Sequence, residues 1–119
     1  MMLLAFLALV VQATPAKPAT AAATAATPND GDLRCIAISS KALAQAPQEK
    51  QLSVVAGMLY FVGRINGRSP KADIEAGVRR ITPSLDNETT WQAEAKRCAA
   101  IMQDRAAYLQ KMGRALQSP

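Results

Sequence analysis

The chain has 119 residues, of which half are apolar but only five are aromatic, and its formal net charge is +5. This length allows one domain, whose core must be built from Leu, Ile, Val, Met and Ala. The sequence contains no histidine, which removes the commonest metal ligand and the commonest general base. The positive charge favours an anionic partner, such as a lipid headgroup, a cell-wall polymer or an acidic protein surface, and a solvated surface is the alternative.

Residues 1–13, MMLLAFLALVVQA, have the features of a secretory signal peptide. The apolar run from Leu3 to Val11 has the length of a signal h-region and is too short to span a bilayer. The short side chains of Val11 and Ala13 favour cleavage after Ala13, although no Lys or Arg precedes the apolar run. The alternative is an N-terminal core helix. We therefore expect a periplasmic or secreted protein that has no transmembrane span after cleavage.

Residues 14–30, TPAKPATAAATAATPND, are low in complexity and have no large apolar side chain to bury, which predicts a disordered linker. The folded domain is then expected over residues 31–119. Its first helix should run from Gly31 to Ala46, with Asn or Asp at position 29, 30 or 32 as its cap and Pro47 as its end. This short helix has two apolar faces, which indicates that it is wedged between neighbours.

The stretch from Gln48 to Gly67, QEKQLSVVAGMLYFVGRING, predicts a helix that is apolar on most of its circumference. Polar or small residues occupy one narrow stripe at spacings of 3, 4, 3 and 4. The residues of this stripe are Lys50, Ser53, Gly57, Tyr60 and Arg64. Because such a helix is normally surrounded by others, we predict that it forms the centre of the domain.

Two further helices are expected after this stretch. Ser69-Pro70 predicts the start of a third helix, whose apolar face continues to Leu85 and which Pro83 interrupts. The last helix should begin near Asp86 or Asn87, reach about Leu116 and extend beyond the domain by about one or two turns. Its apolar stripe is the most regular in the chain and consists of Trp91, Ala95, Cys98, Met102, Ala106, Leu109, Gly113 and Leu116.

These elements predict an all-α bundle of about four helices. Seven large apolar side chains are expected to form its core. They are Val55, Leu59, Phe61, Val62, Trp91, Met102 and Leu109.

The two cysteines, Cys35 and Cys98, lie on either side of the apolar stretch. In an exported chain two cysteines most often form one disulfide, which here would link the first and last helices. Two buried free thiols are the alternative. A catalytic thiol is not expected, because the chain has no histidine to activate it.

No catalytic constellation, metal-ligand set or phosphate-binding loop stands out, so we expect neither an enzyme nor a bound cofactor. Basic residues gather at the corner between the second and third helices and a few turns beyond it. They are Arg64, Arg68, Lys71, Arg79 and Arg80, a candidate edge for an anion or a protein partner. Ordinary solvation is the alternative. No aromatic residue interleaves with them, which argues against nucleic-acid binding.

A resemblance to known protein families rests on three segments: Asp32-Leu33-Arg34-Cys35, the run from Gly57 to Arg64, and the pair Arg97-Cys98. Their order after a signal peptide resembles small periplasmic HdeA-type acid-stress chaperones and the immunity proteins that neutralise type VI secreted amidases. Two features depart from the HdeA-type pattern: the span between the cysteines is long, and the chain has only nine carboxylates.

The resemblance implies an exported helical module that binds other proteins as a chaperone, an inhibitor or an immunity protein. An envelope-associated structural protein, attracted to anionic lipid or cell-wall surfaces, is the alternative function.

Overall fold

The computed structural model describes residues 27–119, which form four α-helices and one 3-10 helix and contain no strand. The elements in chain order are α1 (Asp30–Gln45), α2 (Gln48–Arg68), α3 (Ile74–Ile81), η1 (Thr82–Leu85) and α4 (Glu88–Gln117). The predicted all-α class with four helices is confirmed. The predicted signal peptide, and the predicted linker as far as residue 26, lie outside the described residues.

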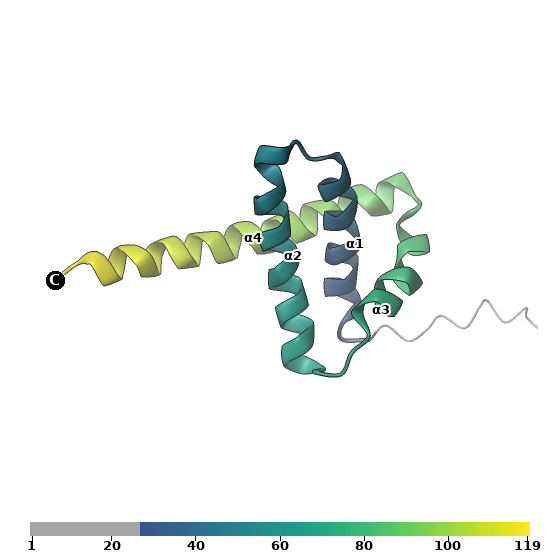
Figure 1. Cartoon of the computed structure of the whole chain (residues 1–119), viewed down its shortest axis with the longest axis horizontal. Helices are drawn as coiled ribbons and strands as arrows, with labels where there is room; N and C mark the ends of the chain where they lie inside the picture. Colours follow the sequence, from purple (N-terminus) through teal and green to yellow (C-terminus); the bar gives the residue numbers. More distant parts are fainter. Residues whose placement is uncertain (1–26) are drawn as a thin grey trace, which may run out of the picture.

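The central helix of the described chain is α1, so the prediction that residues 48–67 form the centre is wrong. Figure 1 shows α1 beside the antiparallel α2, with α3 along its other side and α4 crossing behind both. Among the described helices, α1 alone packs against α2, α3 and α4. Its buried residues Leu33, Ile36 and Ala37 lie on one face and Cys35 lies on another, as expected for a helix wedged between neighbours.

Helix α2 is covered on one side only. Of its 21 residues, Phe61 and Ile65 are buried, whereas Leu52 is 79% exposed and Leu59 is 62% exposed. The helices of residues 27–119 do not surround α2, because α4 crosses α2 instead of running along it (Figure 1). Residues 48–67 are apolar on most of the helix circumference, yet the helix that they form is not buried on all sides.

The predicted core is correct only in part. Phe61 is 1% exposed, and Val62, Trp91 and Met102 are partly buried side chains that pack against the core. Val55 is also partly buried. Leu59 and Leu109 are wrong, since 62% and 56% of their surfaces are exposed. The core contains six residues that the prediction missed, three of them on α1: Leu33, Ile36, Ala37, Ile65, Ile81 and Leu85.

The predicted disulfide between Cys35 and Cys98 is confirmed, and it joins α1 to α4. The two Cα atoms lie 5.6 Å apart, in the ordinary range for a disulfide. Cys35 is fully buried and Cys98 is 6% exposed, so the bond lies within the core and not at its edge.

The caps of the later helices explain where these helices begin. Asp73, and not Ser69-Pro70, starts the third helix, because its carboxylate accepts a hydrogen bond from the Ala76 amide at 3.0 Å. Asn87, one of the two residues near which the last helix was predicted to begin, caps α4 in the same way through the Thr90 amide at 3.1 Å. Behind its cap, α3 lies so close to α1 that a Cβ atom on Gly77 would come within 2.9 Å of the Leu33 side chain.

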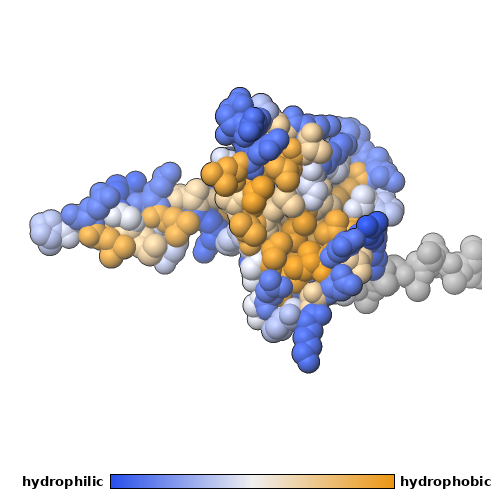
Figure 2. All heavy atoms as spheres, viewed as in Figure 1, coloured by the Kyte–Doolittle hydropathy of each residue, from blue (hydrophilic) through white to orange (hydrophobic). Residues whose placement is uncertain are grey.

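Helix α4 projects far beyond the other helices (Figure 1). From Gln103 to Gln117 every residue except Gly113 is exposed, so the exposed part is longer than the predicted one or two turns. Apolar side chains follow one side of this projection (Figure 2). Those exposed by 42% or more are Tyr108, Leu109, Met112 and Leu116.

Phe61 and Leu59, two large apolar residues of α2, provide a test of the core. Replacing Phe61 with Ala should lower the free energy of unfolding by about 3–5 kcal/mol, because the side chain is fully buried. Leu59→Ala is the matched control, two residues away on the same helix but exposed, and should change stability by no more than about 0.5 kcal/mol. Urea denaturation measures both, and equal losses would contradict the packing described for α2.

Reduction of the disulfide provides a second test. The bridge closes a loop with a sequence separation of 63 residues, and opening it should cost about 4 kcal/mol on the chain-entropy model. Thermal unfolding with and without reductant measures the loss. Protein taken from its native compartment should show no thiol reactive under denaturing, non-reducing conditions, and two reactive thiols per chain would contradict the bridge.

Candidate functional site

Three of the five basic residues predicted to form an anion-binding edge are paired with acids of another helix. Arg64 and Arg68, on the last two turns of α2, both pair with the carboxylate of Asp32 on α1. The Asp32 side chain is 4% exposed, and the Arg64 Nε lies 3.2 Å from its Oδ2. One carboxylate thus faces two guanidinium groups, which leaves an excess of positive charge at this end of α2.

Asp30 holds the third of these residues, Arg80 of α3, through a contact of 2.6 Å. The same carboxylate accepts hydrogen bonds from the Thr27 amide and hydroxyl, at 3.1 and 2.6 Å. These bonds, led by that from Arg80, lower the pKa of Asp30 from 3.8 to about 2. Residues 27–30, which the sequence assigned to the linker, therefore take part in the fold.

The five residues do not form one edge. Arg79 pairs with Glu75 one turn earlier on the exposed side of α3, and Lys71 is exposed in the connection before that helix. The three residues predicted as possible caps of the first helix do not cap it through their side chains. Asp30 and Asp32 lie on its first turn as buried ion-pair partners, and the side chain of Asn29 at the N-cap makes no cap hydrogen bond. Only Arg64 of the five also lines a cavity together with cations from another helix.

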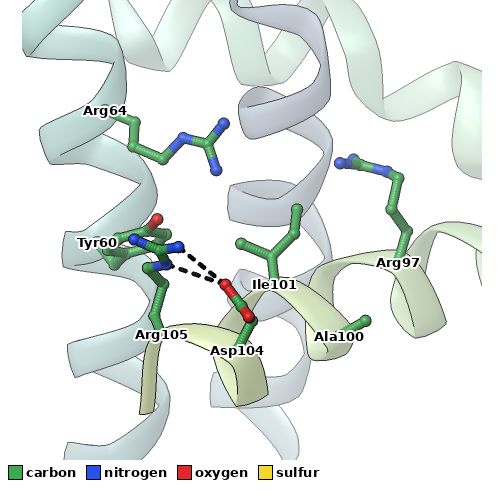
Figure 3. Close-up of a pocket in the computed structure, with 7 residues that line it drawn as sticks. All are labelled: Tyr60, Arg64, Arg97, Ala100, Ile101, Asp104 and Arg105. Atoms are coloured by element: carbon green, nitrogen blue, oxygen red, sulfur yellow. Dashed lines mark hydrogen bonds and ion pairs between the residues drawn. The ribbon is translucent and has the colours of Figure 1, made fainter. Parts of the chain in front are cut away.

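This cavity, the α2/α4 cleft, lies where α2 crosses α4 and has a volume of about 530 Å³. Figure 3 shows the guanidinium groups of Arg64 and Arg97 pointing toward one another across it. Arg105 lies beside Tyr60 and bends back to Asp104, which it contacts at 2.9 Å. The remaining lining residues are apolar, Ala100 and Ile101.

Three guanidinium groups and one carboxylate line the α2/α4 cleft. Each guanidinium also contacts an acid: Arg64 contacts Asp32, Arg97 contacts Glu94 and Arg105 contacts Asp104. Arg97 is anchored by its Nη2, which lies 2.6 Å from Glu94 and donates to the Gly31 carbonyl at 2.8 Å. Arg64 faces Asp32 through Nε, and its terminal nitrogens point into the cleft (Figure 3). A guanidinium carries five N–H donors, so both residues retain capacity for an anion.

A second hollow, the apolar groove, shares Tyr60 and Arg105 with the cleft and has a volume of about 470 Å³. Its floor comes from the narrow stripe of α2 that the sequence analysis described as polar or small. That stripe, through Ser53, Gly57 and Tyr60, faces α4, and Leu109 closes the groove from the projecting part of α4. Cleft and groove together form a continuous surface along the crossing.

Three residues of the cleft were not predicted as site residues from the sequence: Tyr60, Arg97 and Arg105. Arg97 and Arg105 are eight positions apart, which places them on one side of a helix, so their common side was detectable from the sequence. Tyr60 and Arg64 share a face of α2 by the same rule. The crossing that brings these two faces together depends on tertiary packing, and no spacing in the sequence indicates it.

Within residues 27–119, no group of three or more carboxylate or cysteine side chains is placed to hold a metal ion. No helix of this part of the chain is long and apolar enough to cross a membrane. Comparisons with protein-family models, with curated proteins and with solved structures find no match to this chain.

The lowered pKa of Asp30 predicts how stability depends on pH. A carboxylate with a lowered folded-state pKa contributes stability that is complete above 3.8 and is lost as the pH falls toward about 2. Asp30→Asn should therefore destabilise the protein at neutral pH by about 1–2 kcal/mol, since the partly exposed Arg80 is screened by water. The variant should also flatten the fall in stability between these two pH values.

Urea unfolding at a series of pH values measures both effects. Asp86→Asn, at an exposed position before α4, is the control and should stay within about 0.5 kcal/mol of the parent at neutral pH. An Asp30→Asn protein as acid-sensitive as the parent would contradict the assigned role of this ion pair.

Proposed function

We propose that this protein is an exported helical module that binds another protein, as a chaperone, an inhibitor or an immunity protein does. The observation that carries the proposal is the uncovered apolar surface of α2 and α4. Six large apolar side chains are exposed by 42% or more: Leu52, Leu59, Tyr108, Leu109, Met112 and Leu116. The four on α4 follow one side of its projecting half (Figure 2), and exposed apolar surface of this kind marks interaction sites in soluble proteins.

Export is supported by the disulfide and by the sequence of residues 1–13. A buried disulfide such as Cys35–Cys98 is typical of oxidising compartments and rare in the cytosol. The apolar run at the N-terminus has the length of a signal h-region. A protein-binding role also agrees with the described site, which is lined by apolar side chains and arginines.

The alternative is an envelope-associated structural protein that binds anionic lipid or cell-wall surfaces. The observation in its favour is the charge of the C-terminus: from Arg105 to Pro119 the chain carries three cations and no acid. The two functions differ in the partner, so one capture experiment that also measures binding to anionic vesicles distinguishes them.

Affinity capture from the native envelope fraction tests the proposed function. The full chain should retain one protein in stoichiometric amount, and Leu109→Glu should abolish retention, because it places a charge on the apolar side of α4. Quantitative mass spectrometry of the eluate measures the ratio. Ala107→Glu is the matched control, since it adds the same charge at an exposed position on another side of α4, and it should retain the partner.

Two results would contradict the proposal. One is equal retention of every captured protein by both variants with none of them in stoichiometric amount. The other is the absence of any stoichiometric protein together with salt-sensitive binding to anionic vesicles. The second result would favour the structural alternative.

A further inference from the structure

The geometry points to the chemistry of the partner: the α2/α4 cleft and the apolar groove form a docking site for an acidic amphipathic helix of another protein. This inference rests on the proposed function and specifies the partner that the module binds. The occupant is argued from the charge of the surface, the shape of the two hollows and the spacing of the exposed side chains.

Charge indicates an acidic partner. Arg64 and Arg97 converge across the cleft (Figure 3), and Arg64 shares the single carboxylate of Asp32 with Arg68. Beyond Asp104 every charged residue of α4 is a cation: Arg105, Lys111 and Arg114. Carboxylates on an incoming segment would find guanidinium donors in the cleft, where charge-assisted hydrogen bonds are stronger than neutral ones.

The same charge argues against a second copy of this chain as the occupant. Two copies joined through this surface would bring the cations of one cleft and one projecting helix toward those of the other. Like charges placed together at an interface lower its affinity, so this surface disfavours a second copy of the chain as a partner.

Shape argues against a lipid surface. The cations of the α2/α4 cleft line a hollow of about 530 Å³ between two crossing helices, where a flat layer of headgroups does not reach all of them. The apolar groove of about 470 Å³ next to it is open enough to receive side chains. An inserted segment with apolar and acidic side chains fits both hollows at once.

The spacing of the exposed side chains indicates a helix. Leu109, Met112 and Leu116 follow one another on α4 at intervals of 3 and 4, the spacing at which one helix packs against another. They continue the line of the groove, which ends at Leu109. A partner helix along this line would place its apolar side chains on the groove and on these residues, with its carboxylates beside Tyr60 and the three arginines.

Binding of a defined peptide to the full chain tests the inference. The probe is a fluorescent synthetic helix of about 18 residues, with leucine at helical spacing on one face and glutamate at the flanking positions. We expect fluorescence anisotropy to show binding that weakens as salt rises from about 0.05 to 0.5 M. The same peptide with lysine in place of glutamate should bind at least about tenfold more weakly.

Two arginines of similar surroundings provide matched variants. Arg105→Glu should weaken binding of the glutamate peptide by at least about tenfold, whereas Arg79→Glu should change it by less than about twofold. Both residues are exposed and paired with a neighbouring acid of their own helix, but only Arg105 lies in the cleft. Neither pairs with an acid of another helix, so circular dichroism should show the parental fold for both.

Three results would overturn the inference. The first is equal binding of the glutamate and lysine peptides, or equal effects of Arg105→Glu and Arg79→Glu. The second is a dimer in sedimentation equilibrium that Leu109→Glu dissociates, since a second copy then occupies the groove. The third is failure of the peptide to bind while anionic phosphatidylglycerol vesicles bind the parent and Arg105→Glu alike.

The failure of this inference is distinguishable from the failure of the proposed function. A stoichiometric envelope protein that is captured equally by the parent and by Arg105→Glu would leave the protein-binding function standing and refute the acidic docking site. Peptide binding with the expected charge dependence, but no stoichiometric protein in the envelope, would support the site and refute the proposed role.

Discussion

The bond between Cys35 and Cys98 determines how the long helix α4 lies on the rest of the domain. It joins α4 to α1 within the core, where Cys35 is fully buried. Helix α1 also holds α2, through Phe61 and Ile65 in the core and through Asp32 beside two arginines. Since α2 and α4 are each fixed to α1 more extensively than to each other, hollows remain where they cross. The α2/α4 cleft and the apolar groove are therefore consequences of a domain that is held together by its first helix.

Two buried carboxylates on the first turn of α1 fix the neighbouring helices. Asp30 faces Arg80 of α3, and Asp32 faces Arg64 and Arg68 of α2. Burying a charge is unfavourable unless it is paired, so an arrangement that separated these groups would carry the full desolvation cost. The acids also lie at the N-terminus of a helix, where the dipole favours negative charge. This role within the fold explains why much of the predicted basic edge is not available as a surface for partners.

The sequence predicted the features that depend on local pattern or on covalent chemistry, and failed on those that depend on packing. Helical periods, the approximate start of the last helix and the pairing of two cysteines were all predictable. Which helix is central was not predictable from the sequence. Residues 48–67 and the helix around Cys35 both have enough apolar surface to pack against more than one neighbouring helix. Leu59 was assigned to the core for the same reason. Leu109 was assigned to it because it continues the regular apolar stripe of the last helix, which the described helices leave exposed there. In the site, Arg97 and Arg105 share a helical face by their spacing, but only the crossing of α2 and α4 places Tyr60 and Arg64 opposite them.

The projecting half of α4 shows what the domain lacks. Most of the stability of a protein helix comes from tertiary packing of its apolar face, and an isolated helix of this length is marginal in water. Yet the apolar stripe continues through Leu109 and Leu116 after the last residues that pack against the core, Ile101 and Met102. In the isolated chain the projecting half of α4 continues the half that packs against the core, and its apolar side chains are exposed to water. A helix bound along the groove would bury those side chains and supply the tertiary contact that the described chain does not provide.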